Sequence, residues 1–171
     1  KGATHGGNGA YYETIFDDEA SQPISNGSAP YTGRFTPYDP TINKLSDFDG
    51  QSITGTWKLV IYNRGNSSAS IDWQLMMDTN NDTPKSKKVY DHTYTGSTLT
   101  VPDNQQSTVF TADINVTDSG KLEDLDVKFN MDSGNSDYLG YAIISPYGTA
   151  VLLKGATHGG NGAYYETIFD D

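Results

Sequence analysis

Residues 108–116 read TVFTADINV, and every second residue from Phe110 to Val116 is apolar. Residues 125–131 read LDVKFNM and alternate in the same way from Leu125 to Met131. Successive side chains of an extended chain point to opposite faces, so each stretch predicts a half-buried strand. No window of a dozen residues shows a helical stripe. The pattern therefore predicts an all-β fold.

Two further pairs of strands surround these stretches. YAIIS (141–145) and AVLL (150–153) flank SPYG, whose Pro and Gly favour a turn, and the three pieces predict a hairpin. TWKLVIY (56–62) and DWQLMM (72–77) are expected to pair through the loop NRGNSSAS. Trp57 and Trp73 lie in these strands and are expected in the core. Hairpins joined by glycine-rich loops favour a β-sandwich.

Composition limits the classes of partner. The 171 residues carry a formal net charge of -11, and the basic residues cluster only at Lys85, Lys87 and Lys88. An acidic chain of this kind is a poor match for phosphate backbones, so no nucleic-acid partner is expected. No apolar run approaches 18 residues, so no membrane insertion is expected. The chain has no cysteine, which excludes disulfides and thiolate metal sites.

The two ends of the chain have the same sequence. Residues 1–18 read KGATHGGNGAYYETIFDD, and residues 154–171 repeat them without a difference. One domain has room for one copy of such a segment, so chains are expected to join neighbours by exchanging it. The apolar residues of the two copies are the candidates for this self-association: Tyr11, Tyr12, Ile15, Phe16, Tyr164, Tyr165, Ile168 and Phe169.

The numbering of the second copy follows from an offset of 153 residues. Tyr11 and Tyr12 recur as Tyr164 and Tyr165, and Glu13 recurs as Glu166. Ile15 and Phe16 recur as Ile168 and Phe169, which leaves Asp170 as the first acid of the repeated run. Glu166 is the counterpart of Glu13 and is not one of the apolar candidates.

Joined head to tail through the repeated segment, the chain shows six landmarks in one cyclic order. They are SP-x-GT at 145–149, FDDEA at 16–20, AP-aromatic-x-G-x-F at 29–35, FDG at 48–50, GTW-x-L at 55–59 and W-x-L at 73–75. This string resembles the P domain, the module that follows the subtilisin-like catalytic domain in proprotein convertases, and above all its bacterial versions. The resemblance covers nearly all of the chain except residues 78–92.

The resemblance implies a jelly-roll β-sandwich that is circularly permuted. Residues 1–79 would be the C-terminal half of a P domain and residues 93–171 the N-terminal half, with residues 154–171 duplicating 1–18. The polar segment between them, residues 80–92, is expected to be a solvated linker. The family often has Gly-Asp-Leu before the SP-x-GT turn, but here Tyr141 and Ala142 follow Gly140, so no role of that acid is carried over.

Runs of acidic residues suggest a site for a hard cation. Adjacent carboxylates repel one another unless a cation with oxygen ligands neutralises them, and Ca²⁺ is the usual one. The calcium dependence found in the P-domain family supports the same interpretation, while a solvated acidic run is the alternative. The candidate ligands are the acids of these runs: Asp17, Asp18, Glu19, Asp47, Asp49, Asp124, Asp126, Asp170 and Asp171.

The sequence offers little for catalysis. His5 and His158 occupy the same position of the repeated segment, His92 lies in the expected linker, and no serine stands in a G-x-S-x-G context. The chain is therefore expected not to be an enzyme. Tyr31, Tyr38 and Tyr147 lie in expected turns, where an exposed ring would suit a ligand.

Three functions remain open. The first is a calcium-stabilised P-domain module of a bacterial extracellular repeat protein, such as an adhesin, stalk or filament, with a cell-surface or matrix partner. The second is an accessory domain of a secreted subtilisin-like protease. The third is an engineered permutant or folding switch, in which the two identical ends compete for one place.

Overall fold

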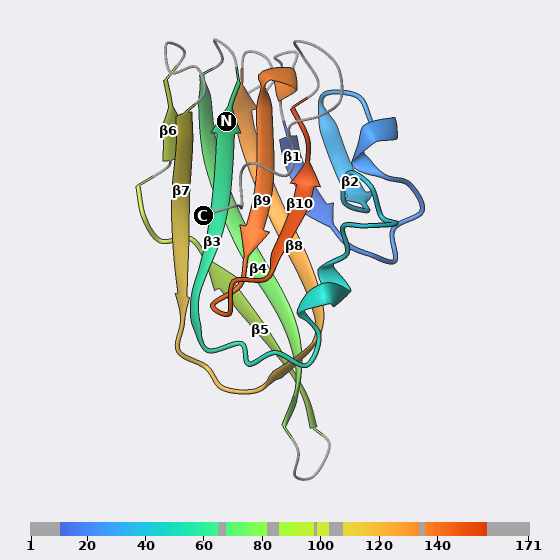
Figure 1. Cartoon of the computed structure of the whole chain (residues 1–171), viewed down its shortest axis with the longest axis vertical. Coiled ribbons are helices and arrows are strands. Elements are labelled where there is room, and N and C mark those ends of the chain that lie inside the picture. Colours follow the sequence, from blue (N-terminus) through green and yellow to red (C-terminus); the bar gives the residue numbers. More distant parts are fainter. Residues whose placement is uncertain are drawn as a thin grey trace, which may run out of the picture.

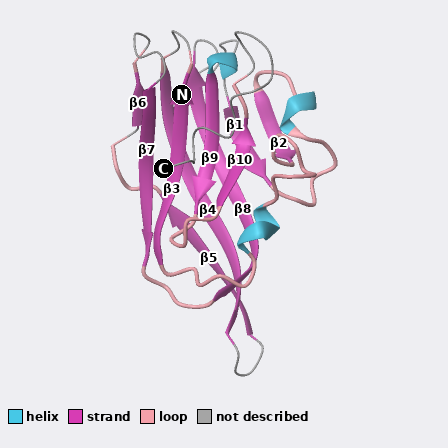
Figure 2. Cartoon of the chain, viewed as in Figure 1, coloured by secondary structure: helices cyan, strands magenta, loops and turns pink. Residues whose placement is uncertain are grey.

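The computed structural model describes residues 11–64, 68–81, 86–97, 99–102, 108–133 and 136–156. In these residues the chain forms strands and three short 3-10 turns, with no α-helix (Figure 2). None of these helical turns is long and apolar enough to span a membrane. The elements in chain order are β1 (Tyr11–Phe16), η1 (Ile24–Asn26), β2 (Tyr31–Phe35), η2 (Leu45–Phe48), β3 (Gly55–Asn63), β4 (Ala69–Asn81), β5 (Ser86–Thr93), β6 (Leu99–Val101), β7 (Thr108–Val116), β8 (Lys121–Ser133), η3 (Ser136–Tyr138), β9 (Leu139–Ile144) and β10 (Ala150–Lys154).

The strands form two sheets that pack face to face, which confirms the predicted β-sandwich (Figure 1). The six-stranded sheet has the order β2-β1-β8-β4-β5, with β6 also paired to β4. The four-stranded sheet has the order β10-β9-β3-β7. Both sheets combine strands from the two ends of the chain, so neither half of the sequence builds a sheet of its own.

The alternating residues that predicted the strands fill the space between the sheets. Val127 and Phe129 of β8 are fully buried, as are Leu59 and Ile61 of β3. Both tryptophans lie in this core as expected. The ring of Trp57 meets Phe48 edge to face at 5.2 Å between centroids, and its indole Nε1 donates to the Ile53 carbonyl at 2.9 Å.

The predicted hairpin of residues 141–153 is confirmed, since β9 and β10 pair antiparallel around the SPYG turn. The SP-x-GT stretch at 145–149 there contacts the segment that leads into GTW-x-L at 55–59. Gln51 accepts a hydrogen bond from Ser145 Oγ at 2.8 Å and donates to Thr149 Oγ1 at 2.8 Å. Gly55, at φ 129°, lies so close to Pro146 that a Cβ would approach the proline ring to 2.7 Å.

Two expectations about pairing need correction. The strands of residues 56–62 and 72–77 are not hydrogen-bonded to each other, because β3 belongs to the four-stranded sheet and β4 to the six-stranded sheet. The segment 80–92, expected as a linker, contributes to the hairpin of β4 and β5, which projects from one end of the sandwich (Figure 1). This hairpin pairs Gln74 with Thr93 and continues to Asn81 and Ser86.

Candidate functional site

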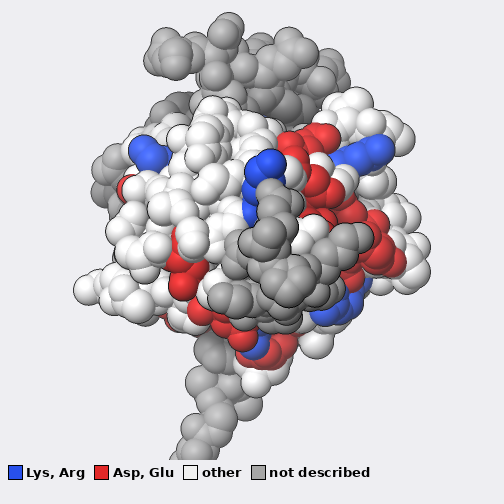
Figure 3. Space-filling view, turned by 90° about the horizontal axis from the view of Figure 1, so that it is seen from below, with Lys and Arg blue, Asp and Glu red and all other residues white. Residues whose placement is uncertain are grey.

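Seven of the nine predicted metal ligands converge on one end of the sandwich. Asp17, Asp18 and Glu19 follow the end of β1, Asp47 and Asp49 belong to η2 and its C-terminal cap, and Asp124 and Asp126 lie on β8. Two backbone hydrogen bonds hold the turn after η2 against β8. Gly50 N donates to Leu122 O at 2.8 Å, and Leu122 N donates to Gln51 O at 2.9 Å. We call these seven residues and Glu123 the acidic cluster. Acidic side chains gather on the face seen from below (Figure 3).

Asp170 and Asp171, the other two predicted ligands, lie outside the described residues.

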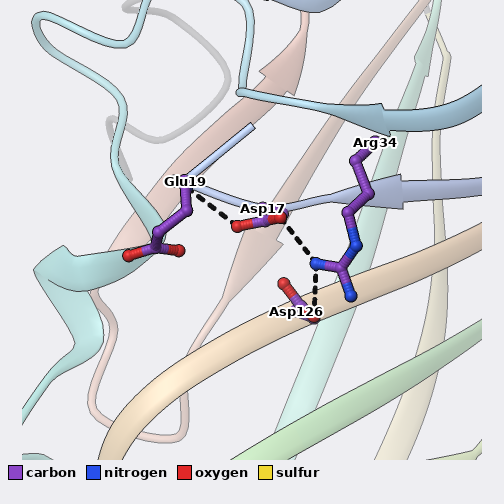
Figure 4. Close-up of polar contacts among 4 residues, drawn as sticks. All are labelled: Asp17, Glu19, Arg34 and Asp126. Carbon is purple, nitrogen blue, oxygen red and sulfur yellow. Dashed lines mark hydrogen bonds and ion pairs between the residues drawn. The ribbon is translucent and has the colours of Figure 1, made fainter. Parts of the chain in front are cut away.

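An arginine lies between two of these acids (Figure 4). Arg34 Nη1 donates to Asp17 Oδ2 at 2.5 Å and to Asp126 Oδ2 at 2.9 Å. The side chain extends from β2 past β1 to β8, the three neighbouring strands at this edge of the six-stranded sheet. The backbone N–H of Glu19 donates to the other oxygen of Asp17 at 2.8 Å. Asp17 is therefore bound through both carboxylate oxygens.

These contacts shift the acidity of the two carboxyl groups in different directions. Burial alone would raise the pKa of Asp17, but hydrogen bonds from Arg34 and at Glu19 hold that pKa below its ordinary value. Burial raises the pKa of Asp126, and the Arg34 guanidinium offsets only part of that effect. Asp17 is the acid that depends most on Arg34 for its charge.

Asp18 has a structural role at the start of η2. Its Oδ1 accepts from Leu45 N at 3.0 Å, and its Oδ2 accepts from Ser46 N and Ser46 Oγ, each at 2.9 Å. The first N–H groups of a helical turn lack partners within the turn, and a carboxylate satisfies them. Asp18 therefore fixes η2 to the end of β1.

Asp49 is the acid most affected by its neighbours. Partial desolvation and then the negative charges of Asp124, Asp18 and Asp47 raise the pKa of Asp49 to about 6. Among the described residues no three acidic or histidine side chains lie together in an arrangement that would hold a metal ion. Protein donors already bind both oxygens of Asp17 and of Asp18 and one oxygen of Asp126. Asp49 is the centre of the candidate metal site, because four further acids add to the desolvation that raises its pKa.

We expect Asp49→Asn to raise the free energy of unfolding at pH 7 by up to about 1 kcal/mol, allowing for solvent screening of this exposed side chain. The folded-state pKa of about 6 lies above the ordinary 3.8, so wild-type stability falls as pH rises from about 4 to 6. The variant lacks this loss. Urea denaturation in EDTA should show equal stabilities near pH 4 and a more stable variant at pH 7. The same difference at both pH values would contradict the electrostatic explanation.

Sequence reasoning missed Arg34 and Glu123. Glu123 stands directly beside Asp124 in the run LEDLD and could have been found by adjacency. Arg34 is a single basic residue in YTGRF, and only the neighbouring positions of β2, β1 and β8 reveal that it serves two acids from distant stretches of sequence.

The N-terminal copy of the repeated segment supplies a central strand. β1 lies between β2, to which it is parallel, and β8, to which it is antiparallel, and we call this place the β1 site. Tyr11 stacks on Tyr31 at 4.5 Å between ring centroids and meets Tyr141 edge to face at 5.7 Å. Phe16 is fully buried, Ile15 is half-buried and Tyr12 is exposed.

The C-terminal copies of these residues, Tyr164, Tyr165, Ile168 and Phe169, lie outside the described residues. Glu166, the counterpart of Glu13, lies outside them as well. Glu13 is exposed and ion-paired with Lys128, so this position contributes a surface charge rather than an apolar contact.

The C-terminal copy supplies the end of a different strand. Lys154, its first residue, closes β10 and is 4% exposed. Its ammonium donates to the carbonyls of Ser136 at 2.9 Å, Gly155 at 3.3 Å and Leu139 at 3.4 Å. Burial lowers the pKa of Lys154 to about 8. Residues 154–156 are all buried, so the start of the second copy is part of the core region.

The domain therefore assembles one copy of the repeated segment from both ends of the chain. Residues 154–156 come from the C-terminal copy and residues 11–18 come from the N-terminal copy. Tyr141 lies at the boundary, because its ring contacts Tyr11 and lies 5.7 Å from Lys154 Nζ. The residues at which one copy gives way to the other, 157–163 and their counterparts 4–10, lie outside the described residues.

The other sequence candidates are placed as follows. His92 lies on β5 with its Nε2 3.4 Å from Asp118 Oδ2, and His5 and His158 lie outside the described residues. Tyr147 is exposed at the SPYG turn as expected, and Tyr38 is half-buried. The expectation for Tyr31 needs correction, because this residue lies in β2 with its ring buried against Tyr11 and Phe35.

No protein-family model, curated protein or solved structure matched the chain in comparisons.

Proposed function

We propose that this chain is a non-catalytic, calcium-stabilised module of an extracellular bacterial repeat protein, such as an adhesin, stalk or filament. Neighbouring copies would join by exchange of the repeated terminal segment. The observation that carries the proposal is the split composition of the domain, which takes residues 11–18 from one copy and residues 154–156 from the other. The resemblance of the landmark stretches to bacterial P domains, with their jelly-roll fold, supports the class of module.

The β1 site accepts a sequence rather than one particular end of the chain. Residues 164–169 have the sequence YYETIF of β1, so they are able to make every contact that β1 makes with β2 and β8. If residues 164–169 of one molecule enter the β1 site of the next, the contact is head to tail. A head-to-tail contact between identical molecules repeats and gives a linear array or a ring.

Engineered disulfides distinguish which copy occupies the site. Ile15 is the register partner of Lys128 on β8, and both side chains are half-buried on the outer face. Directly opposed residues of antiparallel strands lie about 4.5–5.5 Å apart at Cα, within the range of a disulfide. The chain has no cysteine of its own. A disulfide between Ile15→Cys and Lys128→Cys therefore shows that the N-terminal copy occupies the β1 site. A disulfide between Ile168→Cys and Lys128→Cys shows that the C-terminal copy occupies it.

We expect the first pair to give an internal disulfide in monomers, and the second pair to give covalent dimers and longer species that increase with protein concentration. Non-reducing electrophoresis and size-exclusion chromatography with light scattering measure both. A chain that ends at Ala156 is the matched control and should remain monomeric. A second pair that forms no disulfide at any concentration would overturn the exchange. An internal disulfide from the second pair in a monomer would instead identify a folding switch.

Calcium, in this proposal, binds at the part of the acidic cluster around Asp49. Asp49 would be the first ligand, and Asp47 and Asp124 would have to move toward it to share the ion, because no three acids of the described residues are already arranged as a metal site. The ion would relieve the repulsion that raises the pKa of Asp49. Addition of calcium chloride to the wild type at pH 7 should therefore raise its melting temperature more than it raises that of Asp49→Asn. Asp113→Asn, an exposed acid on the other sheet, is the matched control. Equal shifts in all three proteins would remove calcium from the proposal.

A further inference from the structure

The outer face of the six-stranded sheet carries a polar groove that the proposed exchange does not explain. One hollow, with a volume of about 340 Å³, is lined by Tyr12, Glu13, Ser70, Asp72, Asn130 and Asp132, with Tyr11 and Met131 at its base. A second hollow of about 320 Å³ includes Ser70, Thr100 and Asp132. Since Ser70 and Asp132 line both hollows, they form one groove across the strands β1, β8, β4 and β6.

A bulge in β1 builds one wall of this groove. Tyr11 pairs with Met131 and Thr14 pairs with Phe129, so three steps along β1 match two steps along β8. The extra residue places both Tyr12 and Glu13 on the outer face, and Glu13 takes a positive φ of 51°. Such bulges redirect side chains and are common beside binding sites. Tyr12 is 51% exposed as a result, one of four large hydrophobic side chains exposed among the described residues.

The floor of the groove holds facing pairs of polar side chains. Asp72 pairs with Asn130, and Ser70 pairs with Asp132 on one side and Thr100 on the other. Asn130 Oδ1 accepts the backbone N–H of Glu13 at 2.7 Å, which orients the amide. The floor thus combines hydroxyl groups that donate and accept, an oriented amide, and carboxylates that accept.

The charge of the groove selects against anionic ligands. Glu13 forms an ion pair with Lys128, so its charge is largely balanced. Asp72 keeps the floor acidic, which repels phosphate, sulfate and uronic-acid groups. A cationic ligand would use the carboxylates but not the hydroxyl and amide donors beside them. A neutral ligand rich in hydroxyl groups uses both.

We propose that this groove binds a neutral oligosaccharide, with one sugar ring packed on the exposed face of Tyr12. The mixed donors and acceptors match pairs of sugar hydroxyls, and the aromatic ring covers the apolar face of a sugar. Four neighbouring strands span about 14 Å, at about 4.8 Å between strands, so the groove accommodates a short chain of sugar rings rather than one. The proposal does not depend on the exchange of terminal segments.

Native affinity electrophoresis of the full chain tests the site. The gels contain hydroxyethylcellulose, xylan, laminarin or mannan, and a separate binding assay uses an oligolysine peptide. Because the sequence repeats Tyr12 as Tyr165, the variant carries both Tyr12→Ala and Tyr165→Ala. We expect at least one polysaccharide to retard the wild type, and the variant to bind about tenfold more weakly. Phenylalanine at both positions keeps the ring and should keep most of the binding.

Tyr147→Ala removes another exposed ring, at the SPYG turn, and should bind as the wild type does. Melting curves of all variants show whether each remains folded. The proposal is overturned if none of the four polysaccharides retards the wild type, or if the alanine variant and the wild type are retarded equally. Binding of oligolysine alone would also overturn it and would assign the groove to basic peptides.

Discussion

Phe16→Ala is expected to lower the free energy of unfolding by about 3–5 kcal/mol in a chain that ends at Ala156, and by much less in the full chain. Phe16 is fully buried and its ring lies 6.5 Å from that of Phe129 between centroids. The full chain carries the same strand again with Phe169 intact. Occupation of the β1 site by that second copy would restore the lost contacts.

The extent of this rescue follows from chain connectivity. The β1 site makes the same side-chain contacts whichever copy fills it. With the N-terminal copy in the site, the chain is interrupted between β10 and β1. With the C-terminal copy in the site, it is interrupted between β1 and β2. The free energies of these two arrangements therefore differ mainly by a loop-closure entropy, which changes by only about 0.6 kcal/mol for each doubling of loop length. Urea unfolding of both chain lengths, with and without the substitution, measures the rescue.

Phe129→Ala is the matched control, because Phe129 is equally buried but its sequence occurs once. Phe129→Ala should lower the free energy of unfolding by the same amount in the full chain and in the chain that ends at Ala156. If Phe16→Ala also lowers the free energy of unfolding equally in the two chain lengths, the C-terminal copy does not enter the β1 site. A rescue that increases with protein concentration would identify a neighbour's copy, and a rescue independent of concentration would identify the chain's own copy.

Arg34→Met is expected to lower the free energy of unfolding at pH 7 by about 2 kcal/mol, a value between those of exposed and fully buried ion pairs. The substitution leaves the buried Asp17 and the half-buried Asp126 as neighbouring negative charges without their shared donor. Arg34→Lys should recover only part of the loss, because an ammonium does not reproduce the planar donor group.

The pH dependence of this loss identifies its cause. The folded-state pKa of Asp17 is below its ordinary value, so its contribution is complete above the unfolded pKa and is lost as pH falls through the folded pKa. The difference between wild type and Arg34→Met should therefore decrease between about pH 5 and pH 2. Lys58→Met, on the exposed face of β3, is the control and should change little. A difference independent of pH would indicate lost packing instead of lost charge pairing.

The fold class could be predicted from the alternation of apolar residues, because each strand has one face in the core. The partner of each strand could not be predicted from periodicity. The connection after β3 crosses to the other sheet, about 10 Å away, and the stretch NRGNSSAS is long enough for either a hairpin or a crossing. β5 was missed because its stretch SKKVYDHT shows no apolar alternation, and part of its hairpin projects beyond the sandwich (Figure 1).

The acidic cluster could be predicted in part for a different reason. Adjacent like charges are visible in sequence, so Asp17, Asp47 and Asp124 were found with their neighbours. Strand order decides that the three acidic runs come together. It also decides that some of their acids bind Arg34, that Asp18 binds the start of η2, and that others surround Asp49. Strand order depends on contacts between residues far apart in the chain, and the local pattern of one sequence does not predict those contacts.

The position of β1 also bears on the order of events during synthesis. Glu13 bonds to Asn130, a residue 117 positions later, so the first copy leaves the ribosome long before its partner strand β8 exists. The second copy is made after both β2 and β8. Under the proposed exchange, the N-terminal copy therefore has to wait for β8 before it can pair, whereas the C-terminal copy meets both partner strands as soon as it is made.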